Sequence, residues 1–208
     1  VIAQAENSSS LNWKAERDGI VPSNKDYFLY PLLDVVARGQ KSSNILDSLK
    51  NLTFVIFNYD RCVERYMDEW LRFRFGENSL STQLRECFIH VYGSLGDYFD
   101  TKSPNVFLNN GQYFSNNPHH DLPQYVDSIK IFTEQEDSET SRKIIQAVNE
   151  AGAIMFLGFG FEEQNMRFFE RGHIDKSLFA TTFHMSEENR KFIKRDLELG
   201  FSRIVKSV

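Results

Sequence analysis

The chain has 208 residues, a length that suits one domain with at most a small appendage. Hydrophobic residues make up 41% and charged residues 25%, which excludes a long disordered chain, and the 19 phenylalanines predict an aromatic core. The net charge of -5 argues against a nucleic-acid groove, because such a groove needs a clustered basic face.

The two cysteines, Cys62 and Cys87, are isolated and fit no CxxC or Cys/His zinc spacing. The sequence shows no signal peptide, and isolated cysteines in such a chain are typical of a reducing cytoplasm. No apolar run approaches the ~20 residues that a membrane span requires. We therefore expect a cytoplasmic protein with no metal, no membrane and no nucleic-acid partner, and the sequence is compatible with a homo-oligomer.

Residues 1–49 are predicted to form an N-terminal helical region. Asn24 is a candidate helix cap, Pro31 would kink or restart the helix, Gly39 would end it, and a short helix around 45–49 follows. The sequence starts without Met, inside a helix-like pattern, and both ends look cut. We therefore expect the chain to be part of a longer protein.

Strands and helices alternate through the rest of the chain, residues 50–208. Continuous β-branched and aromatic runs predict strands that are buried on both faces, as in a parallel sheet. The strand candidates are residues 53–57, 87–92, 129–132, 153–157, 179–184 and 203–206. Helical spacing recurs over 63–75, 144–151 and 162–171, and between a Ser186 cap and Gly200.

This order predicts a single α/β domain over residues 1–208, with a doubly wound, mainly parallel sheet and helices on both faces. Residues 97–125 form a long loop rich in Asn, Pro and Gly, which is either a functional flap or a disordered insertion. Ligands of such sheets bind at the carboxyl ends of strands. That rule selects the junctions 58–60, 92–96 and 158–165.

Asn58 and Asp60 follow the first buried strand directly. An amide and a carboxylate in this place can bind ribose hydroxyls or a carboxamide and can orient a water. Asp60 can instead cap the helix behind it, an ordinary role for Asp, whereas Asn58 is harder to explain in that way. Arg61 could bind a phosphate, but an ion pair with Glu64 or Asp60 is the simpler interpretation.

His90 and Tyr92 mark the second junction, with Ser94 just beyond. Two residues apart on a strand, His90 and Tyr92 would share a face, and one of them could act as an acid or base. The alternative is a buried Tyr with a satisfied hydroxyl and a core His.

Gly158 and Gly160 flank Phe159 at the third junction, and Phe161 follows. Glycine lets a ligand approach the backbone closely, and the N-terminus of the next helix attracts phosphate. A simple tight turn explains the pattern equally well, because Glu163 stands where the GxGxxG motif needs its last Gly.

Two other groups of residues have simpler explanations. The His119-His120-Asp121 run is interpreted as a polar loop, because it has no partner cluster that would complete a metal site. The basic residues near the end of the chain are interleaved with acidic ones, which is typical of a solvated helix face.

Three segments, in this order and spacing, resemble motifs of the sirtuin-like family of NAD-binding proteins. Phe57-Asn58-Tyr59-Asp60 matches the Asn and Asp of a Thr-Asn-Tyr-Asp strand end. Tyr92-Gly93-Ser94 falls in the place of His-Gly-Ser, and Gly158-Phe159-Gly160-Phe161 resembles a Gly-Tyr-Ser-like motif. The chain is more similar to an uncharacterised bacterial branch with NYDR, H-x-YG and FLGF-x-x-x-x-QNM segments.

The resemblance implies a Rossmann-like sheet that binds NAD or a related nucleotide. It implies that Asn58 and Asp60 face the nicotinamide-ribose side, with Gly93 and Ser94 at the same ligand. It also implies that the segment Gly158-Phe159-Gly160-Phe161 approaches the adenosine ribose or the phosphates.

The chain departs from the family pattern in three places. Tyr92 stands where the family has its general base, which leaves His90 as the substitute. The Gly-Ala-Gly diphosphate loop would lie upstream of Val1, so the sheet would be incomplete at its N-terminus. The four-cysteine zinc module of protein deacylases is absent, which argues against histone-type deacylation.

These departures fit the bacterial sirtuin-like proteins that hydrolyse NAD, several of which act in antiphage defence. The expected function is binding of NAD, with hydrolysis of its nicotinamide–ribose bond as the candidate activity of Asn58, Asp60, His90 and Tyr92. The alternative is a non-enzymatic nucleotide-binding or sensing module that has lost the family's catalytic His.

Overall fold

The computed structural model describes residues 28–76, 82–99, 129, 139–169, 176–201 and 205–207. They belong to two compact units, residues 1–131 and 132–208, and each unit is considered by itself. Both combine helices with a small parallel sheet, as the α/β prediction expects. The prediction of one domain with one doubly wound sheet stays a prediction.

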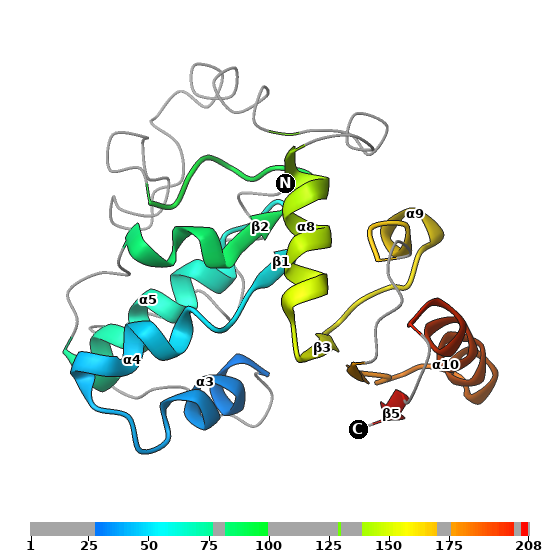
Figure 1. Cartoon of the computed structure of the whole chain (residues 1–208), viewed down its shortest axis with the longest axis horizontal. Coiled ribbons are helices and arrows are strands. Elements are labelled where there is room, and N and C mark those ends of the chain that lie inside the picture. The colour runs from blue at the N-terminus through cyan, green and yellow to red at the C-terminus, as the bar shows by residue number, and fades with distance from the viewer. Residues whose placement is uncertain are drawn as a thin grey trace. The chain divides into compact units, whose positions relative to one another are not determined.

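The first unit contains a two-stranded parallel sheet with helices before and between its strands (Figure 1). Its elements are α3 (Leu29–Ala37), α4 (Ser42–Leu49), β1 (Phe54–Ile56), α5 (Cys62–Phe75), the 3-10 helix η1 (Thr82–Cys87) and β2 (Phe88–His90). The predicted strands at 53–57 and 87–92 are thus confirmed in shorter form. Phe54 lies opposite Phe88 in the parallel ladder, and their rings stack with centroids 5.5 Å apart.

The apolar core of the first unit is built mainly by helices. Apolar residues recur three and four positions apart, which places them on one face of each helix. These apolar faces pack together. The fully buried members are Leu29, Leu33, Ile45, Leu49, Tyr66, Leu71 and Leu84, with Met67 and Trp70 nearly so. This core fixes α5 against the segment that precedes β1, and α5 begins six residues after that strand ends.

The predicted cap Asn24 lies outside the described residues, and the helix that contains Pro31 begins at Leu29. Pro31 lies in the first turn of α3, where a missing backbone N–H leaves no helical hydrogen bond unmade. The helix ends in a tight turn, in which Gln40 N donates to Ala37 O at 2.9 Å. Gly39 supplies the φ of +75° that this turn requires, so its predicted role as a helix stop is confirmed.

The segment after β2 is fastened to α5. The Tyr98 hydroxyl donates to Asp68 Oδ2 at 2.8 Å, and burial together with the charge of Asp68 raises the pKa of Tyr98. Tyr98 therefore stays protonated and donating at neutral pH. Gly93 forms an isolated antiparallel bridge to Ile129, and the rest of the predicted strand at 129–132 lies outside the described residues.

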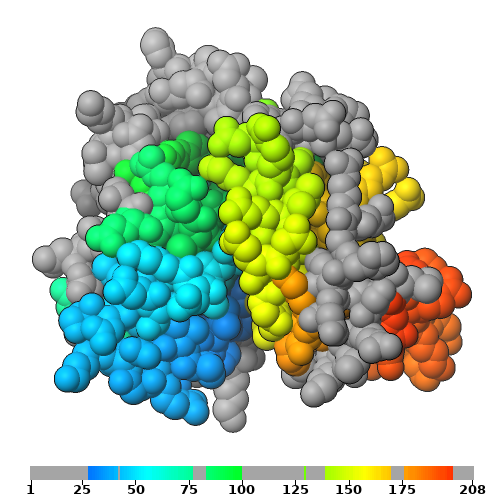
Figure 2. Space-filling model, viewed as in Figure 1, coloured from blue at the N-terminus to red at the C-terminus, as the bar shows by residue number. Residues whose placement is uncertain are grey.

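The second unit contains a three-stranded parallel sheet in the order β3-β4-β5. Its elements are α8 (Glu139–Glu150), β3 (Ala153–Phe156), α9 (Glu163–Met166), β4 (Ser177–Ala180), α10 (Glu187–Phe201) and β5 (Val205–Ser207). Helix α8, yellow-green in Figure 2, buries Ile144 and Val148. Lys176 Nζ donates to the Val148 and Asn149 carbonyls at the end of α8.

Two strand predictions in the second unit need correction. The strand at 153–157 is present, but it is not buried on both faces, because the Met155 side chain is 52% exposed. The strand at 179–184 begins two residues earlier and ends at Ala180. The Thr181–Thr182 pair favours a strand locally, whereas His184 has a φ of +59°, which no strand residue adopts.

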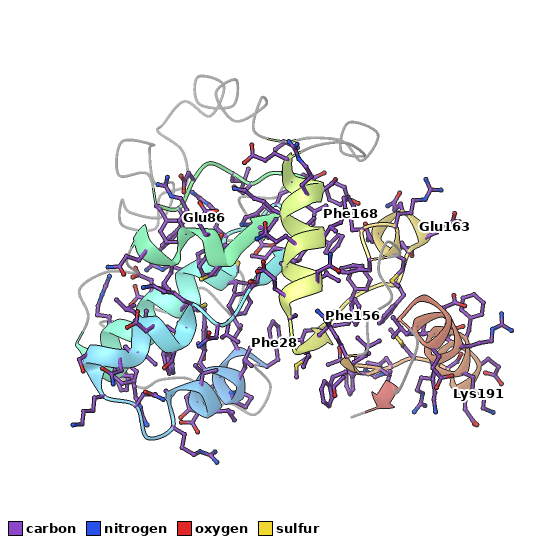
Figure 3. All side chains as sticks on the ribbon, in the orientation of Figure 1. Phe28, Glu86, Phe156, Glu163, Phe168 and Lys191 are labelled. Carbon is purple, nitrogen blue, oxygen red and sulfur yellow. The ribbon has the colours of Figure 1, made fainter. Side chains whose placement is uncertain are left out.

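Helix α10 begins where the sequence predicts. Ser186 Oγ accepts a hydrogen bond from Asn189 N at 3.2 Å, the geometry of an N-cap. The helix runs one residue past Gly200, to Phe201. Its basic residues are exposed, and Lys191, on the outer side of α10 in Figure 3, pairs with Glu187 at 2.9 Å. This matches the predicted solvated helix face for the basic residues 190–195, whereas Lys206 lies in β5 and Arg203 lies outside the described residues. None of the described helices is long and apolar enough to cross a membrane.

Candidate functional site

The carboxyl ends of β1 and β2 lie side by side in the first unit (Figure 1). The ladder continues one residue past β2, because Val91 N donates to Ile56 O at 2.9 Å. The following loops are also joined, since Leu95 N donates to Tyr59 O at 3.1 Å. The structure therefore brings the predicted residues Asn58, Asp60, His90, Tyr92, Gly93 and Ser94 together at one edge of this sheet.

Asn58 and Asp60 have different positions at this edge. Asp60 Oδ1 accepts a hydrogen bond from Cys62 N at 3.2 Å, at the start of α5. The N-cap position itself is Arg61, so Asp60 is bound at the start of the helix without being its predicted cap. The Asn58 side chain is exposed and forms no hydrogen bond with the described residues. Asn58 is thus the member of the pair whose side chain is available to a ligand.

His90 is held between two acceptors. Its Nδ1 lies 3.2 Å from the Asn58 carbonyl oxygen, and its Nε2 lies 2.6 Å from Glu64 Oε1. Both side chains are largely buried, with exposed fractions of 12% for His90 and 3% for Glu64. Glu64 Oε2 is also buried and has no hydrogen-bond partner among the described residues.

The environment of His90 favours its protonated form. Burial lowers the pKa of His90, but the hydrogen bond and charge of Glu64, the Asn58 carbonyl and the charge of Asp60 together raise it further. The net effect places the pKa of His90 above its ordinary value. The sequence left open whether His90 is an acid/base or a core residue, and this geometry favours a core histidine with both nitrogens engaged.

Tyr92 lies beyond the end of β2, so the expectation that it shares a strand face with His90 does not apply. Its ring packs instead against Phe57 and Tyr59, with centroids 6.1 and 6.4 Å away. Burial and the nearby Tyr59 raise the pKa of Tyr92. Its phenol is therefore protonated at neutral pH and cannot serve as a general base there.

Gly93 and Ser94 shape the turn after β2. Gly93 has a φ of +79° and Gly96 a φ of +85°, conformations that glycine adopts without strain. The Ser94 hydroxyl donates to the Gly96 carbonyl at 2.9 Å. Ser94 thus closes its own turn.

Gly158 and its neighbours form a tight turn at the end of β3, in the second unit. Gly158 has a φ of +59°, and its N–H donates to Thr181 Oγ1 at 2.9 Å. Thr181 N in turn donates to Phe156 O at 2.9 Å, so the ends of β3 and β4 are joined. Since a phosphate needs backbone N–H groups that are not already bonded, this geometry favours the tight-turn alternative.

The aromatic residues of this segment pack on one another. Phe159 and Phe161 lie edge to face at 5.1 Å, and both contact the ring of Phe156 at 5.4 Å. Phe169 closes the group, 5.3 Å from Phe156. Phe161 has a φ of +54°, an unfavourable conformation for a bulky residue, so packing of its ring offsets backbone strain.

The N-terminus of helix α9 offers little attraction for a phosphate. It spans Glu163–Met166, a single turn, and its first residues carry the carboxylates of Glu162 and Glu163. Glu163, at the outer edge in Figure 3, pairs with Arg167 at 3.1 Å. The rest of the predicted helix over 162–171 lies partly outside the described residues.

The remaining expectations concern metal sites and ion pairs. Glu64, predicted as a partner of Arg61, is hydrogen-bonded to His90 instead. The described residues contain no group of three ligating side chains, and His119, His120 and Asp121 lie outside them.

Sequence reasoning missed Glu64 as a site residue. Four residues after Asp60 and in the first turn of α5, it has the pattern of a helix-dipole or surface carboxylate. Its partner His90 lies on strand β2, 26 residues away, and no local periodicity connects the two. The available signal was that a carboxylate and a histidine both stood near predicted strand ends.

The chain matches no protein-family model, and no curated protein and no solved structure matches it. Function is therefore argued from the geometry of the site.

Proposed function

We propose that the chain binds NAD or a related nucleotide at the strand-end site of the first unit, formed by Asn58, Asp60, Gly93 and Ser94. One observation carries the proposal: the carboxyl ends of two neighbouring parallel strands present the exposed Asn58 amide beside a glycine-containing turn. Such edges are the common ligand sites of parallel α/β sheets. We further propose that the chain adopts a Rossmann-like fold.

Within this proposal, Asn58 is the main polar contact to the ligand. Its amide both donates and accepts hydrogen bonds, which suits a ribose hydroxyl or a carboxamide. Asp60 holds the start of α5 through the Cys62 N–H and adds negative charge beside the site. This negative charge suits the cationic nicotinamide-ribosyl end of NAD better than it suits the phosphates.

The candidate activity is hydrolysis of the nicotinamide–ribose bond. Water adds to the ribose C1′, the bond to nicotinamide breaks, nicotinamide leaves as a neutral molecule, and the water gives up one proton. Because the leaving group needs no proton, loss of the family's histidine does not by itself prevent the reaction. Asn58 would orient the water or the ribose.

A binding or sensing module without catalysis is the second candidate, and a specific observation favours it. Both nitrogens of His90 face acceptors of the chain itself, and the pKa of Tyr92 is raised. Neither residue is therefore a ready base for a water. The adenosine role of residues 158–161 remains part of the proposal, although the Gly158 N–H already donates to Thr181 Oγ1.

Calorimetry with NAD and with ADP-ribose tests binding, and chromatographic measurement of released nicotinamide tests hydrolysis. Asn58→Ala is expected to weaken binding about tenfold, the value of a hydrogen bond to a ligand group in a polar site. Asn189→Ala, an exposed Asn on α10, is the matched control and should bind as the original chain does.

The outcomes separate the candidates. Nicotinamide release that Asn58→Ala abolishes supports the hydrolase. Tight binding without release supports the sensing module. If neither nucleotide binds, both candidate functions are contradicted.

A further inference from the structure

The side chains of Glu64 and His90 connect three elements beneath the strand-end site. Glu64 belongs to the first turn of α5, His90 is the last residue of β2, and Asn58 follows β1. The distances are 2.6 Å from Glu64 Oε1 to His90 Nε2 and 3.2 Å from His90 Nδ1 to the Asn58 carbonyl oxygen.

The partners of His90 determine where its protons are. A carbonyl oxygen only accepts hydrogen bonds, and so does an ionised carboxylate. Each ring nitrogen of His90 therefore faces an acceptor, and a neutral imidazole carries a proton on only one nitrogen. Both contacts are satisfied together when His90 is an imidazolium and Glu64 is a carboxylate.

We propose that Glu64 and His90 are positioning residues: Glu64 holds His90 doubly protonated, and His90 anchors the main chain of Asn58 so that the Asn58 side chain stays available to the ligand. The ligand part of this inference rests on the proposed nucleotide-binding function. His90 acts through Asn58 and touches no reacting atom, since neither ring nitrogen retains a lone pair for a substrate proton.

Burial makes this arrangement more than a surface ion pair. With exposed fractions of 12% and 3%, the two side chains are shielded from the solvent that weakens exposed pairs. The charge of Asp60 has the same sign as that of Glu64, so it also favours the imidazolium form of His90. The inference predicts that ligand binding depends on the protonation of a residue that does not contact the ligand.

Nitrogen NMR of the histidine-labelled chain tests the protonation state directly. The chain has five histidines, and His90→Gln identifies the His90 signals by their loss. At about pH 7, where an unperturbed histidine is mostly neutral, both ring nitrogens of His90 should carry protons. An unprotonated ring nitrogen at that pH would overturn the inference, and this measurement on the unsubstituted chain needs no variant to fold.

Binding measurements test the positioning role. Glu64→Gln keeps the shape and removes the charge, so the His90 titration should move to lower pH, and NAD or ADP-ribose should bind about tenfold more weakly near pH 7. Affinity of the original chain should fall as pH rises through the His90 titration, and in Glu64→Gln that fall should begin at lower pH. Glu188→Gln, an exposed carboxylate on α10, is the control and should change neither property.

The failures can be told apart. If nucleotides bind and Glu64→Gln binds like the original chain, the positioning role is wrong and the proposed function stands. If the ring is doubly protonated and no nucleotide binds, the proposed function fails and the pair only stabilises the fold, which also overturns the positioning role.

Discussion

At the scale of single residues, the most consequential contact is the one between Glu64 and His90. A buried carboxylate whose second oxygen lacks a hydrogen-bond partner among the described residues depends on this one neighbour. The desolvation of such a group is offset only while its partner is present. Stability and site geometry therefore depend on the same pair of side chains.

His90→Ala should lower the free energy of unfolding by about 3–5 kcal/mol, because it leaves the Glu64 carboxylate buried without its partner. The double variant Glu64→Met/His90→Leu should lose less than His90→Ala alone, since neither charge remains. Urea unfolding followed by circular dichroism measures both values. A double variant that is less stable than His90→Ala would contradict the assignment of the loss to a stranded charge.

The pH dependence of stability follows from the raised pKa of His90. When the folded state binds a proton more tightly than the unfolded state, the stabilisation is complete below the unfolded pKa of about 6.5 and is lost as pH rises through the folded value. The free energy of unfolding should therefore fall as pH increases above about 6.5. Urea titrations at a series of pH values should show this slope in the original chain.

In His90→Gln the corresponding part of the slope should be absent, because no imidazole remains at that position. A slope that is unchanged in this variant would assign the pH dependence to another group.

At the scale of elements, helix caps and strands were predictable from neighbouring residues, whereas contacts between distant segments were not. Ser186 was recognised as the cap of α10 because a cap depends on neighbours in sequence. The β-branched and aromatic runs located β1, β2 and β3 for the same reason. Strand β4 begins at Ser177, two residues before the predicted start, because a polar Ser carries no strand signal and Leu178 is compatible with a helix or a strand.

Sequence reasoning located the candidate site but not its internal connections. That Asn58 and His90 would meet followed from the adjacency of strand ends. The hydrogen bond of Gly158 to Thr181 and the tie of Glu64 to His90 depend on how separate segments pack. Periodicity carries no information on such pairings.

Ser186→Ala should destabilise the chain by about 1 kcal/mol, because α10 loses the hydroxyl that accepts the Asn189 N–H. Ser43→Ala is the control: Ser43 is exposed on α4, and its hydroxyl bonds only the adjacent Asn44 side chain among the recorded contacts. Thermal unfolding compares the two variants. Equal stability of both would show that the Ser186 cap contributes nothing measurable.

The turn after β3 offers a matched pair of glycines. Gly158→Ala should cost about 1–2 kcal/mol, because a left-handed φ of +59° disfavours any Cβ. Gly160→Ala should cost less, since its Cβ would meet only the Glu162 side chain at 3.8 Å. Thermal unfolding gives both values.

The same two variants test the ligand role of this segment. If the tight-turn interpretation is correct, both should retain nucleotide affinity once folded. A large loss of affinity in Gly160→Ala, without a loss of stability, would indicate instead that the nucleotide approaches the backbone there.

At the scale of the whole molecule, the chain consists of two compact units, each with its own parallel sheet. The predicted site residues are divided between them, with residues 58–94 in the first unit and 158–161 in the second. The proposed ligand role of each segment can therefore be tested separately.

Hydrogen exchange with and without NAD tests both segments. Ligand binding stabilises the folded state by mass action, by about 2.7 kcal/mol at a hundredfold excess over Kd. Protection should increase in peptides that cover β1, the start of α5 and the turn after β2, and should stay unchanged in α10. Added protection in the turn after β3 would support the predicted ligand role of residues 158–161, and no change anywhere would contradict nucleotide binding.

Most charged side chains of helix α5 have a bonding partner. Glu64 pairs with His90, Arg65 pairs with Glu69 at 2.9 Å, and Asp68 accepts the Tyr98 hydroxyl. A substitution at one member of a buried pair strands the other, so divergence at these sites should proceed through linked changes. In relatives of this chain, substitutions at positions 64 and 90 should therefore occur together, as should those at 65 and 69. Substitutions on the apolar face of the same helix should occur independently of one another.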